Sequence, residues 1–141
     1  MTIEGVFKTK LNIIPTSGGS VLHGYKNNGD IDSSEINEVY FSIIKYKQVR
    51  AWKMHTKMTL NLVVPIGSVR IRLIKENGMN GKNLKRQNEV LSQDPYFRLT
   101  IPPGIWFSME GLTTGKNLIC NIADYAHDPD EVLKKDPNFF S

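Results

Sequence analysis

The chain has 141 residues and a formal net charge of +4 at pH 7, which together predict a single globular domain spanning residues 1–141. Hydrophobic residues make up 40% and charged residues 23% of the chain, as is typical of globular proteins. No apolar run reaches the ~18 residues that a membrane-spanning helix requires, and the small positive charge favours an anionic small-molecule partner over nucleic acid.

Strands dominate the first half of the predicted structure. Apolar and polar residues alternate over 6–14, and the lysines in this segment indicate an edge strand. A turn is expected over 15–20 and a short strand over 21–26. The polar segment 27–34 indicates a loop, and its Asp-x-Asp spacing lacks the later glycine and glutamate of a calcium loop. Aromatic and β-branched residues over 39–46 indicate another strand.

The second half continues this pattern after a central segment, residues 50–67. Alternating apolar and basic residues over 68–75 predict a half-exposed strand, and the turn pairs within 76–88 predict a long loop. Asp128 is expected to cap a short helix over 129–135, in a loop-rich C-terminal tail that starts near residue 128. Many short strands with almost no helical periodicity predict an all-β sandwich or barrel. Further strands are predicted at 90–91, 96–101, 105–109 and 117–123.

The central segment carries the most plausible reacting group of the chain, His55. Its apolar half, 60–64, predicts a buried strand. Because side chains alternate along a strand, Lys53, His55 and Lys57 would share one face. Such a cationic face suits a diphosphate or an enolate, and the neighbouring charges would lower the pKa of the histidine and keep it basic near pH 7. The alternative is a solvated strand with a chance histidine.

Two segments resemble a known family. Arg50 and His55 at a spacing of five, and the run Leu-Thr-Ile-Pro-Pro-Gly-Ile-Trp-Phe over 99–107, resemble the cupin-fold sugar-nucleotide enzymes. The similarity is to the dTDP-4-dehydrorhamnose 3,5-epimerases and the related dTDP-4-keto-6-deoxyhexose 3,4-isomerases, and it extends to the C-terminal segment 124–131. The resemblance implies an all-β cupin jelly roll, a double-stranded β-helix, which binds a nucleoside diphosphate sugar in its barrel.

The resemblance also implies a reaction. In these epimerases a histidine removes a proton next to a C4 ketone, a tyrosine returns a proton to the other face, and cationic groups stabilise the enolate and the diphosphate. His55 matches the base. The histidine expected after the Pro-x-Gly turn is Phe107 here, and the tyrosine expected four residues before Asp124 is Cys120.

Two functions from different classes follow. The retained His55 and its flanking lysines favour a sugar-nucleotide epimerase or isomerase that abstracts a proton α to the keto group of an NDP-4-keto-6-deoxyhexose. The missing tyrosine and histidine favour a non-catalytic cupin that binds a nucleotide sugar or a carbohydrate. A 3,4-ketoisomerase is a third option.

Other side chains complete the predicted site. Tyr40 shares a strand face with Ser42 and is the better candidate for the general acid. Guanidinium groups match phosphate oxygens, so arginines are diphosphate candidates, although each could equally form a surface ion pair. The predicted catalytic residues are His55, Lys53 and Tyr40, and the predicted substrate-binding residues are Arg50, Lys57, Asn61, Arg98 and Trp106.

No metal or other cofactor is expected. Metal-binding cupins use His-x-His, a glutamate and a further histidine, and only His55 occupies one of those places. The lone Cys120 and the absence of a secretory signal at the N-terminus indicate a reducing cytoplasm. Open sheet edges in a small barrel, with the strand at 6–14 placed to pair with a neighbour, predict a homodimer. His127 is expected on the surface because it lies in a loop.

Overall fold

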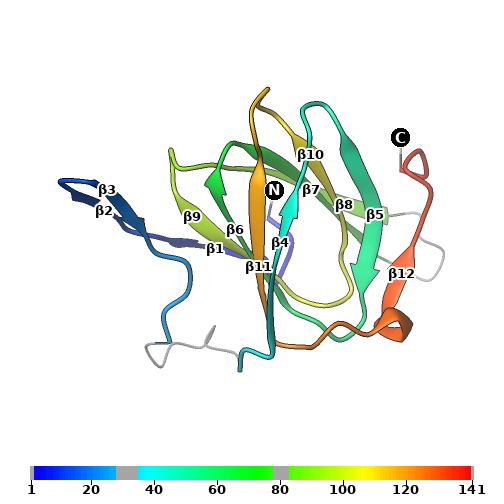
Figure 1. Ribbon diagram of the computed structural model, residues 1–141. Helices are drawn as coiled ribbons and strands as arrows, with labels where there is room; N and C mark the ends of the chain where they lie inside the picture. Colours follow the sequence, from blue (N-terminus) through cyan, green and yellow to red (C-terminus); the bar gives the residue numbers. More distant parts are fainter. Residues whose placement is uncertain (1, 28–34, 78–82, 141) are drawn as a thin grey trace.

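The computed structural model describes residues 2–27, 35–77 and 83–140, so most of the polar segment 27–34 lies outside the described residues. The regular secondary structure of the described chain is almost entirely antiparallel strand, as predicted (Figure 1). The strands are β1 (Phe7–Lys10), β2 (Ile13–Thr16), β3 (Gly19–Leu22), β4 (Glu38–Ile43), β5 (Val49–His55), β6 (Leu60–Ile66), β7 (Val69–Asn77), β8 (Asn83–Leu91), β9 (Phe97–Ile101), β10 (Trp106–Gly111), β11 (Leu118–Ala123) and β12 (Val132–Lys134), and a 3₁₀ helix, η1 (Pro129–Glu131), precedes β12.

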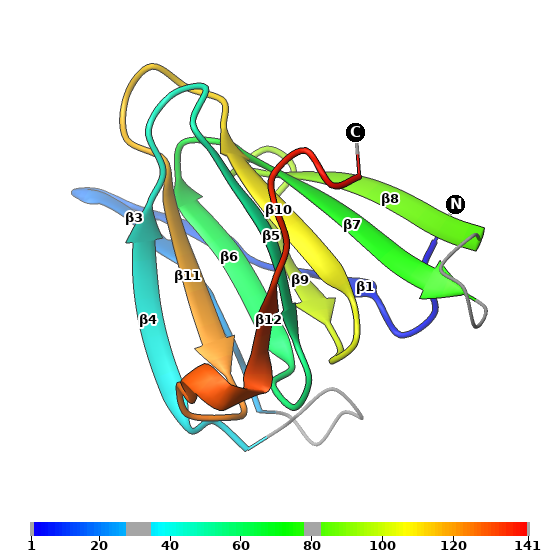
Figure 2. The ribbon, with the colours of Figure 1, turned by 90° about the vertical axis from the view of Figure 1, so that its right-hand side faces the viewer.

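Two five-stranded sheets face each other across the core. The first sheet has the strand order β1-β9-β6-β11-β4, and the second sheet has the order β12-β5-β10-β7-β8. In Figure 1 the two sheets splay apart at the end where β4 and β12 lie, and Figure 2 shows β12 at the front, beside β5. Every second residue of the inner strands points into the core, for example Leu60, Leu62 and Val64 of β6. No helix of the described residues is long and apolar enough to cross a membrane.

The N-terminal region departs from the predicted single strand over 6–14. The segment divides into β1, which pairs with β9 at an edge of the first sheet as expected, and β2, which forms a hairpin with β3. The expected turn over 15–20 is shorter, because Pro15 is paired within β2 opposite Ser20. The hairpin projects from the body of the molecule in Figure 1.

The predicted loop over 76–88 is wrong. β7 continues to Asn77, and β8 pairs with it in register from Asn83 to Leu91. Leu84 packs against a cluster on the outer face of the second sheet that contains Ile74 and Trp106, so strand pairing and burial outweigh the polar composition of the segment. Residues 78–82 lie outside the described residues.

The C-terminal tail also carries more structure than predicted. Only Pro129–Glu131 is helical, with Asp128 as its cap: the Asp128 side chain accepts a hydrogen bond from the backbone of Asp130. The chain then adds β12 to the edge of the second sheet, where it pairs with β5. This strand places Val132 and Lys134 beside the space between the two sheets.

Candidate functional site

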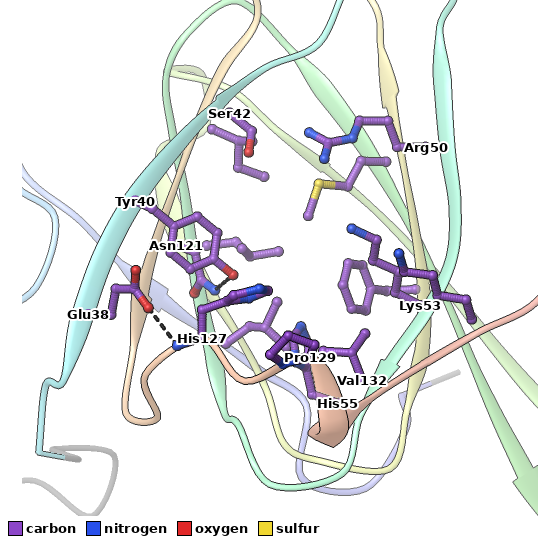
Figure 3. Close-up of a pocket in the computed structure, with 16 residues that line it drawn as sticks. Glu38, Tyr40, Ser42, Arg50, Lys53, His55, Asn121, His127, Pro129 and Val132 are labelled. Carbon is purple, nitrogen blue, oxygen red and sulfur yellow. Dashed lines mark hydrogen bonds between the residues drawn. The ribbon is translucent and has the colours of Figure 1, made fainter.

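A cavity of about 360 Å³ opens between the two sheets at their splayed end (Figure 3). Its floor is apolar, and its walls carry charged and polar side chains from β4, β5, β11, the loop before η1, and β12. The floor consists of Leu60, Leu62, Phe107, Met109 and Ile119, and the polar lining consists of Glu38, Tyr40, Ser42, Arg50, Lys53, His55, Asn121, His127 and Lys134.

His55 lies at one end of the cavity and is 6% exposed. Its Nδ1 atom contacts Oε1 of Glu131, whose side chain is buried beneath it. The imidazole stacks on Phe107, with ring centroids 5.8 Å apart and planes inclined by 10°. When Nδ1 donates its proton to the carboxylate, Nε2 is left without a proton, so the pair holds the tautomer that a general base requires.

Glu131 is held as a carboxylate. Its Oε2 accepts backbone hydrogen bonds from Lys57 at 3.0 Å and Met58 at 3.2 Å. Burial acts to raise the pKa of Glu131, but the hydrogen bonds from His55 and from these two backbone groups outweigh burial and lower the pKa below its ordinary value. A charged carboxylate therefore faces the imidazole throughout the neutral pH range.

A cationic wall lies on the β5 side of the cavity. Phe107 of β10 pairs with Lys53 of β5 and Met109 pairs with Arg50, so two residue steps along β10 match three steps along β5. This bulge reverses the alternation of β5, so Arg50 and Lys53 both reach the cavity although they are three residues apart. Lys134 of β12 lies directly opposite Lys53 in the strand register and also lines the cavity.

The cations of this wall repel one another. Burial, Arg50 and Lys134 lower the pKa of Lys53, in that order of size. Like charges directly opposite each other on paired strands are destabilising. A ligand with negative charge relieves this repulsion, so the wall is suited to an anion.

The opposite wall comes from β4 and is polar. Glu38, Tyr40 and Ser42 alternate along the strand and face the cavity, as the shared face of Tyr40 and Ser42 predicts. The hydroxyl of Tyr40 accepts a hydrogen bond of 2.9 Å from Asn121 of β11. Burial, as the largest cause, raises the pKa of Tyr40, so the phenol remains protonated at neutral pH.

Four of the predicted substrate-binding residues do not line the cavity. The Lys57 ammonium lies over the Tyr125 ring, 5.7 Å from its centroid, because β5 ends at His55 and the alternation does not continue. Trp106 is buried on the outer face of the second sheet and donates to Glu76. Asn61 and Arg98 hydrogen-bond each other on the outer face of the first sheet.

Two further candidates from the sequence, Tyr96 and Cys120, also lie outside the cavity. Tyr96, expected to enter the cavity together with Arg98 or not at all, also lies outside and donates to the backbone of His23. Cys120 packs against Val63 and Tyr96 on the outer face, where burial raises the pKa of its thiol. It therefore has no access to a ligand in the cavity.

Sequence reasoning missed several residues of the site. Glu131 was visible only as part of a terminal motif, because its pairing with His55 spans 76 positions. Lys134 was missed because β12 was not predicted. His127 is exposed, as predicted, yet it lines the mouth of the cavity, held by its backbone N–H on Glu38 at 2.6 Å.

The donor set does not favour a metal ion. In the part of the chain that the structure describes, no three His, Cys, Asp or Glu side chains lie close enough together to hold one. Lys53 and Phe107 occupy the places that ligands hold in metal-binding cupins, and Nδ1 of His55 is engaged by Glu131.

Comparison with solved structures decides the fold. A dTDP-sugar isomerase from Desulfovibrio desulfuricans superposes with a TM-score of 0.90 at 28% identity, over 97% of this chain and 87% of that one. The chain has a cupin jelly-roll fold. The cupin also matches the 3,4-ketoisomerase QdtA from Thermoanaerobacterium thermosaccharolyticum, with a TM-score of 0.76 and 24% identity over 95% of this chain and 90% of that one.

The epimerases of this group share the fold as well. The dTDP-4-dehydrorhamnose 3,5-epimerase from Sulfolobus tokodaii superposes on the cupin with a TM-score of 0.83 at 14% identity, over 98% of this chain and 81% of that one. No protein-family model and no curated protein matches the sequence. The resemblance predicted from the sequence, to the cupin-fold dTDP-sugar isomerases and epimerases, is thus confirmed.

Proposed function

We propose that this cupin is a sugar-nucleotide epimerase or isomerase that removes a proton α to the keto group of an NDP-4-keto-6-deoxyhexose. The observation that carries the proposal is the buried pair of His55 and Glu131 at the end of a cavity with a cationic wall. The similar structures include a dTDP-sugar isomerase and a ketoisomerase bound to TDP-4-keto-6-deoxyglucose.

The residues have separate tasks in this reaction. Nε2 of His55 takes the proton from the α carbon, the C–H electrons form a carbon–carbon double bond, and the carbonyl electrons move to oxygen as an enolate. Lys53 stabilises that oxygen or the diphosphate, together with Arg50. Tyr40, on the facing wall, returns a proton to the intermediate as general acid. The phenolate regains its proton from solvent, and the imidazolium of His55 releases its proton to solvent.

The alternative is a cupin that binds a nucleotide sugar without turnover. The replacement of the expected histidine by Phe107 and of the expected tyrosine by Cys120 favours it. Incubation of the protein with a panel of keto nucleotide sugars in deuterium oxide separates the two functions. Deuterium at a carbon next to the ketone is expected. Binding of these compounds without any deuterium uptake would establish the binding cupin instead.

Lys53→Met is expected to weaken the binding of a nucleoside diphosphate about tenfold or more. A hydrogen bond to a charged group contributes roughly 1.5–3 kcal/mol, and about 1.4 kcal/mol corresponds to a factor of ten. Isothermal titration calorimetry with the nucleoside diphosphate measures the change. Lys57→Met is the matched control, since that ammonium lies outside the cavity over Tyr125, and its affinity should equal that of wild type. Equal losses in both variants would contradict the assignment of Lys53.

A homodimer is part of the proposal. β4 is an edge strand of the first sheet, and its outer face exposes Val39, Phe41 and Ile43 by 50%, 63% and 60%. The projecting β2–β3 hairpin exposes Ile14 by 45% and Val21 by 49%. A second copy that places its hairpin over this face would bury both apolar surfaces by one two-fold operation.

Phe41→Asp is expected to convert a dimer into a monomer, because it places a charge at the centre of that exposed face. Light scattering at micromolar concentration reports the mass. Val90→Asp, at a similarly exposed position on the outer face of the second sheet, should leave the dimer intact. A monomeric mass for the wild type would refute the dimer.

A cytoplasmic location is also part of the proposal. The single cysteine, Cys120, is free and buried, so the fold does not use a disulfide. Such a chain suits the reducing conditions of the cytoplasm.

A further inference from the structure

Asn121 of β11 connects the two neighbouring strands of the first sheet, β6 and β4, through its side-chain amide. It lies on β11 directly opposite Tyr40 of β4 in the strand register. Its Oδ1 accepts the backbone N–H of Asn61 at 3.0 Å. Its Nδ2 donates to the Tyr40 hydroxyl at 2.9 Å and to Sδ of Met58 at 3.6 Å, and Figure 3 shows the contact between Asn121 and Tyr40 at the cavity wall.

The orientation of the Asn121 amide is fixed by its surroundings. A backbone N–H can only donate, so the atom that faces Asn61 must be the oxygen. The NH₂ group therefore faces Tyr40. Asn121 is 4% exposed, so an amide rotated by 180° would point a buried N–H at the backbone N–H of Asn61. Both donors would then lack an acceptor, which destabilises the folded state.

This orientation decides where the Tyr40 proton points. Since the phenol oxygen accepts from Asn121, the phenol must donate its own proton elsewhere. Among the described residues its one acceptor is Sδ of Met58 at 3.9 Å, a thioether at the limit of contact. A ligand oxygen or carbanion in the cavity is a much better acceptor.

We propose that Asn121 is a positioning residue, which holds the Tyr40 hydroxyl as a proton donor aimed at the ligand. The proposal rests on the proposed function, since it describes how the general acid of that reaction is set. Of the proposed catalytic groups, Asn121 hydrogen-bonds only the phenol oxygen of Tyr40 among the described residues. It is therefore required for the return of a proton to the intermediate and not for proton removal by His55.

Asn121→Asp tests this assignment with little change in shape. The new carboxylate still accepts the backbone N–H of Asn61, but it accepts the phenol proton in place of donating to the phenol oxygen. The negative charge beside Tyr40 should raise the pKa of that tyrosine by about one unit or more. The pH titration of phenolate absorbance, compared with Tyr40→Phe to isolate the signal of Tyr40, measures the shift without substrate.

The reaction gives the second readout. Product formation should fall about tenfold or more in Asn121→Asp, while deuterium uptake at the α carbon stays within a few-fold of wild type. In a Tyr40→Phe background the same substitution should add little further loss. Where Asn121→Asp does not fold, Asn121→Ser serves instead: its short hydroxyl does not reach Tyr40, and the same separation of exchange from product is expected.

The outcomes are distinct. An unchanged tyrosine titration in the variants would overturn the positioning role, whatever the enzyme does. An equal loss of exchange and product would also overturn it, because Asn121 would then act on the whole site. A shifted titration in a wild-type protein that exchanges no deuterium would refute the proposed function and leave the hydrogen bond of Asn121 to Tyr40 standing.

Discussion

His55→Gln is expected to lower deuterium uptake into a keto nucleotide sugar by at least about a hundredfold. General-base catalysis contributes about 10²–10⁴-fold, and glutamine has no group that accepts a carbon-bound proton near neutral pH. Ligand affinity should change much less, because Arg50 and Lys53, which we propose bind the anion, still line the cavity in this variant. Exchange is followed by the loss of the α-proton signal in deuterium oxide.

A second cavity histidine provides the matched control. His127 lines the mouth of the same cavity and is anchored through its backbone. His127→Gln removes an equivalent side chain and should retain most of the exchange. Exchange at the wild-type rate in His55→Gln, or its loss in His127→Gln alone, would show that the base is elsewhere.

Most of the fold follows from local sequence patterns. The buried strand β6 is predicted from its continuous apolar run. Strands β4, β9, β10 and β11 are predicted from β-branched and aromatic residues that lie between turn signals. β8 and β12 are not predicted in this way. β8 is rich in polar residues, and β12 has only three residues. Both become strands because the open edges of β7 and of β5, respectively, accept their backbone groups. The formation of β8 and β12 is therefore determined by the strand that each pairs with and not by its own residues.

The residues of the candidate site also fall into those that local sequence patterns predict and those that depend on long-range contacts. Strand alternation finds Lys53 beside His55 and Tyr40 beside Ser42, because these pairs are local. Alternation fails at Lys57, where β5 has ended. Asn61 and Arg98 obey the alternation of their strands but face outward, and the sequence does not show which face of a strand lines the cavity. The bulge in β5 and the long-range contact from Glu131 to His55 depend on tertiary pairing. Neither leaves a signal that a single sequence reveals.

Glu131→Gln is expected to lower exchange by at least about tenfold. The amide oxygen can satisfy the backbone N–H groups of Lys57 and Met58, which leaves the NH₂ group facing Nδ1 of His55. Nδ1 must then accept, so the ring proton moves to Nε2 and the base is blocked. Amide substitution of a carboxylate that orients a catalytic histidine lowers turnover by up to about 10⁴-fold. Unchanged exchange would mean that Glu131 has only a structural role.

The same substitution should change how stability depends on pH. The pKa of Glu131 in the folded protein lies below its ordinary value of 4.5. The folded state therefore binds this proton more weakly than the unfolded chain, so the stability that the carboxylate contributes is fully present above the unfolded pKa and is lost as the pH falls through the folded pKa. Glu131→Gln lacks this titrating contribution.

Urea unfolding of wild type and Glu131→Gln across the acid range measures that contribution. The difference in the free energy of unfolding should be largest above about pH 5 and should shrink as the pH falls, because only the wild type loses stability by protonation at this position. Glu110→Gln is the control: that carboxylate is partly exposed and pairs with Arg70 and Arg72, and solvent-exposed ion pairs contribute about 0–1 kcal/mol. A difference for Glu131→Gln that stays constant with pH would show that the buried carboxylate contributes through its shape and not through its charge.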